Sequence, residues 1–353
     1  MPVSFLSTTQ RERYGSYPEV LSSEELARYF HLDDDDREWI ATKRRDSSRL
    51  GYALQLTTVR FLGTFLEDPT AVPGTVLHTL SSQLGIADHS ACVIDYRTTR
   101  QRWQHTAEIR TRYGYREFAE HGTQFRLGRW LCALCWTGTD RPSALFDYAN
   151  GWLVGHKVLL PGVTVLERFI AEIRSRMESR LWRLLVRGVT DEQRQRLDDL
   201  LKPVEGGRQS WLDRLRKGPV RVSAPALVLA LLRIETVRGL GIKLPGTHVP
   251  PSRISALARF ASTVRVSAVA RLPQERRIAT LVAFVHCLEA SAQDDAIDVL
   301  DLLLRELFTK AEKEDRKVSR CATRSRRACR ASICRKSCWK SPRAPAAWRR
   351  SRT

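Results

Sequence analysis

The sequence predicts an all-α protein with two helical domains, helix-turn-helix-like units in the first of them, and a disordered basic tail. Apolar residues recur at helical spacing through most of the chain, and Gly or Pro residues separate one such segment from the next. No alternation of apolar and polar residues is strong enough to predict a sheet, and no fixed repeat is present. Beyond Lys317 the chain has no acidic residue and no leucine. We therefore place the domains at residues 1–161 and 162–317 and the disordered tail at 318–353.

Short helices with tight turns between them make up the predicted first domain. Ser22 or Ser23 can cap one helix and Ser47 or Ser48 another, because a serine oxygen accepts a hydrogen bond from a free amide of the first turn. The basic corner at 43–45 lies between two short helices, as in a helix-turn-helix bundle. We expect helices at about residues 23–30, 33–45, 47–66, 74–86, 96–118, 124–136 and 143–154.

The segment Tyr96–Phe118 is the one around which the first domain is predicted to be organised. It contains six arginines, one histidine, four Tyr or Trp residues and only two acidic residues. In a helix over this segment, one side carries apolar positions such as Tyr96, Trp103 and Ile109, and the other side is mostly Arg and Gln. One face can therefore pack against a core while the other offers cations to a polyanion.

The predicted second domain begins after Pro161 and Gly162 with a long helix from Thr164 to about Arg187. Apolar residues recur along it at heptad-like spacing, which is typical of a connecting or coiled helix. These residues are Leu166, Ile170, Ile173, Met177, Leu181 and Leu184. Further helices are expected at about residues 191–201, 224–240, 254–266, 275–290 and 294–313.

The net charge of +20 indicates a polyanionic partner, but the charge is unevenly distributed. Twelve of the 59 Lys and Arg residues lie beyond Lys317, where there is no Asp or Glu, so residues 1–317 carry 47 basic and 39 acidic residues, a net charge of +8. The basic character of the folded part must therefore be judged from local clusters.

Nothing in the sequence suggests export. The N-terminal segment lacks an apolar stretch with a cleavage site, and the longest apolar run, 224–232, is too short to cross a bilayer. Without an export signal, the cysteines are expected to be reduced thiols. We therefore expect a bacterial cytoplasmic protein associated with the nucleoid, with no membrane, small-molecule ligand or cofactor.

Two basic clusters are candidates for contacts with nucleic acid, because the planar guanidinium of arginine fits both phosphates and guanine edges. The alternative is a solvated helix face on which Glu108 and Glu117 pair with the arginines, and charge density alone does not separate the two interpretations. The candidate DNA-binding residues are Lys43, Arg44, Arg45, Arg49, Arg60, Arg97, Arg100, Arg102, His105, Arg110, Arg112 and Arg116.

Enzymatic and metal-binding interpretations receive less support. Arg100-x4-His105 matches a spacing found in some all-α ribonucleases, but five residues rotate two side chains apart by about 140° on a helix. No catalytic residue is therefore assigned. Cys132 and Cys135 have CxxC spacing without a second ligand pair nearby, so no metal site is expected.

Several separate blocks of the chain, taken together, have the pattern of one protein family. They are MPVSFLSTTQRERYG, the spacing LxxxxLxxYFxLxxxDxxxI at 21–40, RLGYALQLTTVRFLG, VPGTVLHTLSSQLGI, the Tyr96–Phe118 segment and the region 164–317. Over about residues 1–317 the chain resembles the start of the Tn-three-family transposases. In that family the N-terminal third binds the terminal inverted repeats, and a distant C-terminal RNase-H-like domain carries a metal-binding DDE triad.

The resemblance implies sequence-specific binding of double-stranded DNA at transposon ends, without the catalytic domain and hence without enzymatic activity. The competing interpretation is a helical interaction scaffold, in which the long helix at 164–187 pairs with a second copy to give a homodimer. A gel shift with the inverted repeat and a scrambled duplex separates the two interpretations.

The tail has the composition of GC-rich coding sequence read in the wrong frame, including its cysteines at 321, 329, 334 and 338. We therefore expect that a frameshift near Lys317 truncated a longer transposase. Sequencing the gene should find the continuation of the family, including the DDE domain, in the next reading frame. A gene without that continuation would refute the hypothesis.

Overall fold

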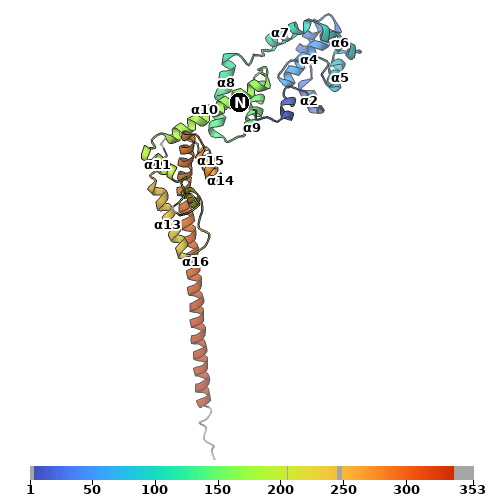
Figure 1. Ribbon diagram of the computed structural model, residues 1–353. Helices are drawn as coiled ribbons and strands as arrows, with labels where there is room; N and C mark the ends of the chain where they lie inside the picture. The colour runs from blue at the N-terminus through green and yellow to red at the C-terminus, as the bar shows by residue number, and fades with distance from the viewer. Residues whose placement is uncertain (1–3, 205, 245–248, 338–353) are drawn as a thin grey trace, which may run out of the picture. The chain divides into compact units, whose positions relative to one another are not determined.

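The computed structural model describes residues 4–204, 206–244 and 249–337, and over these ranges the chain is all-α, as the sequence predicts (Figure 1). No strand occurs in them; two isolated β-bridges are the only extended pairings described. None of the described helices is long and apolar enough to cross a membrane. The helices form two compact units.

Unit 1 consists of Met1–Gly188, Leu244–Thr263 and Leu272–Ala283. The boundary predicted at residue 161 therefore falls inside this unit. Its helices are α1 Thr8–Arg13, α2 Ser23–Tyr29, α3 Asp34–Ala41, α4 Asp46–Leu62, α5 Gly74–Leu84, α6 His89–Thr98, α7 Gln101–Tyr113, α8 His121–Thr137, α9 Pro142–Gly155, α10 Val163–Val186, α14 Pro251–Thr263 and the start of α16, Gln274–Ser337.

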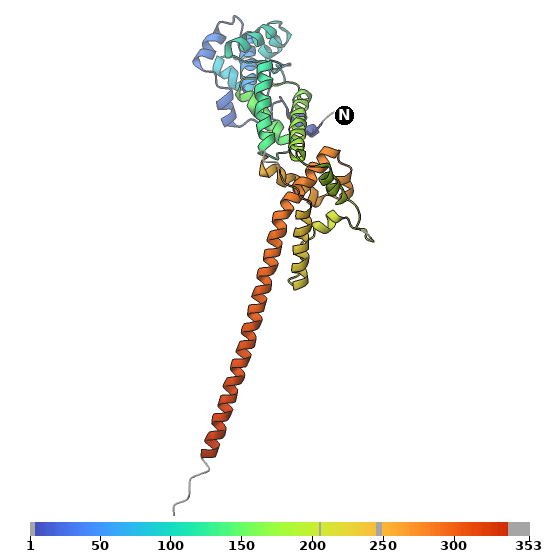
Figure 2. The same ribbon diagram turned by 90° about the vertical axis from the view of Figure 1, so that its left-hand side faces the viewer.

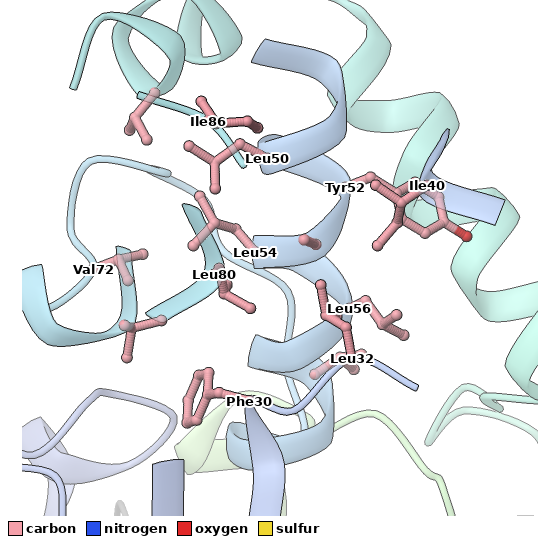
Figure 3. Close-up of a cluster of buried hydrophobic side chains, with 14 of the residues drawn as sticks. Phe30, Leu32, Ile40, Leu50, Tyr52, Leu54, Leu56, Val72, Leu80 and Ile86 are labelled. Atoms are coloured by element: carbon pink, nitrogen blue, oxygen red, sulfur yellow. The ribbon is translucent and has the colours of Figure 1, made fainter. Parts of the chain in front are cut away.

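Helix α4 is the centre of the first core of unit 1. Its sequence between Leu50 and Val59 is apolar or small at most positions, and every residue in this stretch is buried. Helices α2, α3, α5, α6 and α7 pack around it, and Figure 3 shows the side chains that fill the space between them. The helix α4 follows the basic corner at 43–45, where a helix-turn-helix bundle would place a DNA-reading helix. Because α4 is enclosed on all sides, it has no exposed face with which to read DNA.

The helix starts follow from local hydrogen bonds. Ser22, one of the two serines predicted to cap α2, is its N-cap, and Glu25 completes a capping box with it. The predicted cap of α4 differs, because the helix already begins at Asp46 and its Ser47 and Ser48 are buried in the first turn. The hydroxyl of Ser48 instead donates to the Oε1 of Gln101 at 2.7 Å, which connects the starts of α4 and α7.

Helix α6 lies unusually close to α4, and glycine makes this approach possible. A Cβ atom at Gly51 would overlap the ring of Tyr96, whose side chain is fully buried. No other residue type fits at position 51 without moving α6.

Helices α8, α9 and α10 form the second core of unit 1, in which Leu131, Leu153 and Leu166 are buried together. The heptad-spaced residues of α10 from Leu166 to Leu181 therefore pack inside the unit and are not free to pair with a second copy. Glu167 is buried in the same region, where it accepts hydrogen bonds of 3.2 Å from the backbone amides of Phe5 and Leu6. It also pairs with Arg11.

Unit 2 consists of Val189–Lys243, Val264–Arg271 and Phe284–Thr353. Figures 1 and 2 both show α13 beside α16, and ion pairs of 2.6 Å between Arg233 and Asp295 and 3.1 Å between Arg238 and Glu289 join the two helices. Its helices are α11 Asp191–Asp199, α12 Trp211–Leu215, α13 Ala224–Gly239, α15 Val266–Ala270 and the remainder of α16.

Helix α16 corrects two expectations. The two helices predicted at 275–290 and 294–313 are one continuous helix, because the residues between them include no Gly or Pro and Ala292 packs inside unit 2. The helix also continues to Ser337, so residues 318–337 are helical where disorder is expected. The rest of the predicted disordered tail, 338–353, lies outside the described residues.

The close approach of α6 to α4 predicts the effect of one methyl group. Gly51→Ala should lower the free energy of unfolding by about 3 kcal/mol, because the added Cβ overlaps Tyr96 within a packed core. Gly151→Ala in α9 is the matched control: no described atom lies within 4 Å of its added Cβ, and the substitution should be neutral or stabilising by up to about 1 kcal/mol. Urea denaturation of the two variants measures both values, and equal stability of the two would contradict the packing argument.

Candidate nucleic-acid interface

The segment predicted as one helix from Tyr96 to Phe118 is two helices, α6 and α7, separated by a short turn. The hydroxyls of Thr98 and Thr99 both donate to the backbone oxygen of Asp95, at 2.8 and 2.9 Å. Such local bonds compete with helical ones, and Thr99 has extended backbone angles. Helix α7 then begins after Arg100, and both helices pack on α4.

His105 is buried, which corrects its assignment as a DNA-binding residue. Only 5% of the residue is exposed, and its ring stacks on Tyr96 at a centroid distance of 5.6 Å and meets Tyr52 edge-on at 5.3 Å. Its Nδ1 shares a hydrogen bond of 3.1 Å with the hydroxyl of Tyr96. Burial, assisted by the charge of Lys43, lowers the pKa of His105 to about 4, so the ring is neutral at pH 7.

The outward face of α7 lies opposite the side that carries the buried His105 and Ile109. Ile109 is fully buried, and the positions half a turn away from it are exposed at spacings of three and four residues. These exposed positions are Arg100, Gln104, Ala107 and Thr111. Trp103, at the edge of the same face, is 69% exposed. The face thus combines long hydrogen-bonding side chains with two small residues that allow close approach of another molecule.

Lys43 fixes the turn between α3 and α4 against α7. Its ammonium group donates to both carboxylate oxygens of Glu108, at 2.7 and 2.9 Å. The same group lies about 5 Å from the ring centres of Trp39 and Tyr52. The charge of Lys43 is therefore compensated within the unit, and its role in the structure is to hold the turn in place.

Three arginines around this junction have no ion pair among the described residues. Arg44 and Arg45 are exposed in the turn, directly before α4. Arg112 is exposed on α7, and its guanidinium lies 4.2 Å from the ring centre of Trp39, whose stacking restricts its orientation. We call Arg44, Arg45, Arg112 and the outward face of α7 the cationic surface.

Arg60 and Arg49 both have hydrogen-bond partners within unit 1. Arg60 donates to both oxygens of the buried Asp36, at 2.6 and 2.8 Å, and Tyr113 donates to the same carboxylate at 2.7 Å. Burial alone would raise the pKa of Asp36, but these hydrogen bonds and the charge of Arg60 outweigh it and lower the pKa. Arg49 is half-buried and donates to the backbone oxygen of Lys43. We therefore remove Arg60 from the candidate contacts.

The remaining four candidate arginines are each bonded within unit 1. They are partnered as follows: Arg97 with Asp68 at 3.6 Å, Arg102 with the backbone oxygen of Glu67 at 2.5 Å, Arg110 with Glu117 at 2.8 Å, and Arg116 with the backbone oxygen of His156 at 3.4 Å. The ion pair between Arg110 and Glu117 is one that the alternative interpretation, a solvated helix face, predicts. Gln104 is not among the candidate contacts predicted from the sequence, although it lies one turn after Arg100 on the same exposed face.

The structure does not support a ribonuclease site at Arg100 and His105 or a metal site at Cys132 and Cys135. Arg100 is exposed while His105 is buried on a different side of α7, so the two cannot act together on one phosphate. Cys132 and Cys135 lie in α8, and burial raises the pKa of the Cys135 thiol. Within the described ranges, no group of His, Cys, Asp and Glu residues is arranged to hold a metal ion.

Comparison with known proteins identifies the family. A family model described as a domain of unknown function, DUF4158, matches residues 5–173. The chain is 43% identical over 320 residues to the transposase for transposon gamma-delta of Escherichia coli strain K12, a match that covers 90% of this chain and 32% of that protein. The chain belongs with the N-terminal regions of the Tn-three-family transposases.

Other Tn-three-family transposases match over a similar span. The transposase for transposon Tn501 of Pseudomonas aeruginosa is 31% identical over 310 residues, and that for Tn21 of Escherichia coli is 28% identical over 312 residues. These matches cover 87% and 88% of this chain but 31% of each relative. The chain thus spans about a third of the length of the curated relatives it matches.

The buried imidazole predicts a pH dependence of stability. The ordinary pKa of histidine is about 6.5, so between about pH 6.5 and pH 4 the unfolded chain binds a proton that folded His105 does not. The stability that comes from burying a neutral His105 is fully present above about pH 6.5 and is lost as the pH falls from about 6.5 to about 4. His105→Gln should flatten the dependence, whereas His121→Gln, at an exposed position, should not. Urea denaturation across the window measures this, and an unchanged slope in His105→Gln would contradict it.

Proposed function

We propose that this chain binds double-stranded DNA at the terminal inverted repeats of a transposon, as the recognition part of a transposase. The observation that carries the proposal is the cationic surface, in which an exposed helix face lies beside arginines that have no ion pair within the part of the chain that the structure describes. The family resemblance and the transposase names of the relatives support the same class of partner.

Helix α7 has the properties needed to read bases in the major groove, which is wide enough to admit an α-helix. Arg100 and Gln104 lie one turn apart on its outward face. Arginine recognises guanine and glutamine recognises adenine through paired hydrogen bonds. The small Ala107 and Thr111 allow the helix to approach the base edges closely. With α6 before it, α7 is the second helix of a helix-turn-helix-like unit.

The arginines beside α7 suit contacts with the phosphates that flank the groove. Arg44 and Arg45 lie in the turn that Lys43 holds against α7 through Glu108. The guanidinium of Arg112 is kept in place by Trp39 and can donate two hydrogen bonds to one phosphate. Such contacts position a protein on DNA without reading its sequence.

We further infer that this chain recognises DNA and does not cleave it. The catalytic DDE triad of the family belongs to a domain far beyond the region that this chain resembles, and the relatives are about three times as long as the matched part. Incubation with supercoiled plasmid and Mg²⁺ tests this inference. Specific cleavage at a repeat end would refute it.

Binding measurements separate base contacts from phosphate contacts. Arg100→Ala and Gln104→Ala should each weaken binding to the inverted repeat by about 1–3 kcal/mol and reduce the preference over a scrambled duplex. Replacing Arg44 and Arg45 with Ala should weaken binding to both duplexes, and the slope of log affinity against log salt should fall in magnitude by about 2. Fluorescence anisotropy with the full chain measures both effects.

Arg126→Ala is the matched control, because Arg126 is exposed on α8, outside the core that supports α7. It should bind as the unsubstituted chain does. Equal affinity of the unsubstituted chain for repeat and scrambled duplexes would refute specific recognition. An equal loss in Arg100→Ala and Arg126→Ala would refute the assignment to α7.

A further inference from the structure

The second half of α16, in unit 2, carries a row of cations along one side. Because successive residues of a helix are rotated by about 100°, all but one of the Lys and Arg residues from 310 to 327 fall within an arc of about 120°. The acidic residues of the same stretch, Glu312, Glu314 and Asp315, lie on other sides of the helix. We call the row the basic stripe. Its members, all of them exposed, are Lys310, Lys313, Arg316, Lys317, Arg320, Arg324 and Arg327.

Most of the basic stripe has no compensating carboxylate. Lys313, Arg320, Arg324 and Arg327 form no ion pair among the described residues. The other three pair with glutamates of the same helix, but exposed pairs of this kind are weak and leave the cation available to another anion. These pairs are Lys310 with Glu306 at 3.9 Å, Arg316 with Glu312 at 3.5 Å and Lys317 with Glu314 at 2.7 Å.

Neighbouring cations of the basic stripe repel one another. Arg316, Arg320 and Arg324 follow at intervals of four residues, which makes each of them adjacent to the next on the helix surface. Like charges at this spacing destabilise a helix. Every side chain from 304 to 327 is exposed, so no packing contact among the described residues offsets the repulsion. A polyanion bound along the stripe would remove it.

We propose that the basic stripe binds the phosphate backbone of double-stranded DNA irrespective of its sequence. At a rise of about 1.5 Å per residue, the stripe is about 25 Å long. The same length of duplex carries about 15 phosphate charges, so every cation of the stripe has phosphates within its reach. Binding releases the counterions condensed on the duplex, and this driving force requires no apolar contact.

The other sides of this stretch argue against a membrane or a protein as the partner. A basic helix that lies on a membrane carries large apolar side chains opposite its cations. Protein interfaces likewise depend on apolar anchors that become buried. Residues 311–327 include no aromatic residue and no Leu, Ile or Met. The stretch therefore has the chemistry to bind a polyanion and little surface to bury against anything else.

Binding to a scrambled duplex tests the proposal apart from the recognition proposed for α7 in unit 1. Replacing Arg320, Arg324 and Arg327 with Gln in the full chain removes three phosphate contacts. The slope of log affinity against log salt should fall in magnitude by about 3, and binding at about 100 mM salt should weaken by at least about tenfold. Fluorescence anisotropy over a salt series measures both values. An unchanged slope would overturn the proposal.

Arg324→Gln and Arg326→Gln form the matched pair. Both arginines are exposed and have no ion pair among the described residues, but a separation of two residues puts them on opposite sides of the helix. Arg324→Gln should lower the slope by about 1. Arg326→Gln should leave it nearly unchanged, because salt screens a charge that lies on the far side. Equal losses in the two variants would refute the assignment to the basic stripe.

Two further measurements identify the kind of contact. Replacing Arg320, Arg324 and Arg327 with Lys keeps the charges and should keep the slope, since phosphates accept either cation. Vesicles of anionic phospholipid should bind the chain more weakly than the duplex does, and equal or tighter binding to vesicles would overturn the choice of DNA.

The outcome is independent of specific recognition by α7. The Gln variant should weaken binding to the inverted repeat and to the scrambled duplex by the same factor, because phosphate contacts do not read sequence. A chain without preference for the repeat would refute the proposed function and leave this inference standing. A changed preference in the Gln variant would contradict a sequence-independent contact.

Discussion

The absence of a side chain at Gly51 is the constraint on which the proposed DNA-binding part of unit 1 depends. It allows Tyr96 of α6 to lie directly on α4. The ring of Tyr96 then supports His105, and His105 together with Ile109 fixes the rotation of α7 about its own axis. The outward direction of Arg100 and Gln104 is thus determined by packing in the core. A rigid base of this kind is what specific recognition requires of a helix in a groove.

Two carboxylates, the buried Asp36 and the half-buried Glu108, divide the cations of this unit into two groups. Asp36 binds Arg60, and Glu108 binds Lys43, in partly enclosed surroundings where an unpaired charge would be costly. These cations hold helices together. Arg44, Arg45 and Arg112 have no carboxylate partner among the described residues and keep their hydrogen-bonding capacity for another molecule. Local charge density in the sequence does not distinguish the two groups, because the carboxylates that pair with them lie 24 and 65 residues away.

Local signals predicted much of the fold. The cap at Ser22 and the helix after Pro73 lie where the sequence places them, because their hydrogen bonds are made within a few residues. The break at Thr98 and Thr99 was not predicted, since apolar periodicity continues across it and only the threonine hydroxyls mark it. The burial of His105 depends on two tyrosines from other helices, and no spacing within α7 reveals them. Of the candidate contacts in the turn at 43–45, Arg44 and Arg45 are exposed, whereas Lys43 is half-buried against α7.

Glu167 makes the beginning of the chain part of the core of unit 1. Its buried carboxylate is compensated by the amides of Phe5 and Leu6 and by Arg11, which come from 156 to 162 residues earlier in the chain. A shortened product that lacks the residues up to Arg11 would therefore have a solitary charge inside α10. Such a product would populate unfolded states more often and be removed by cellular proteases.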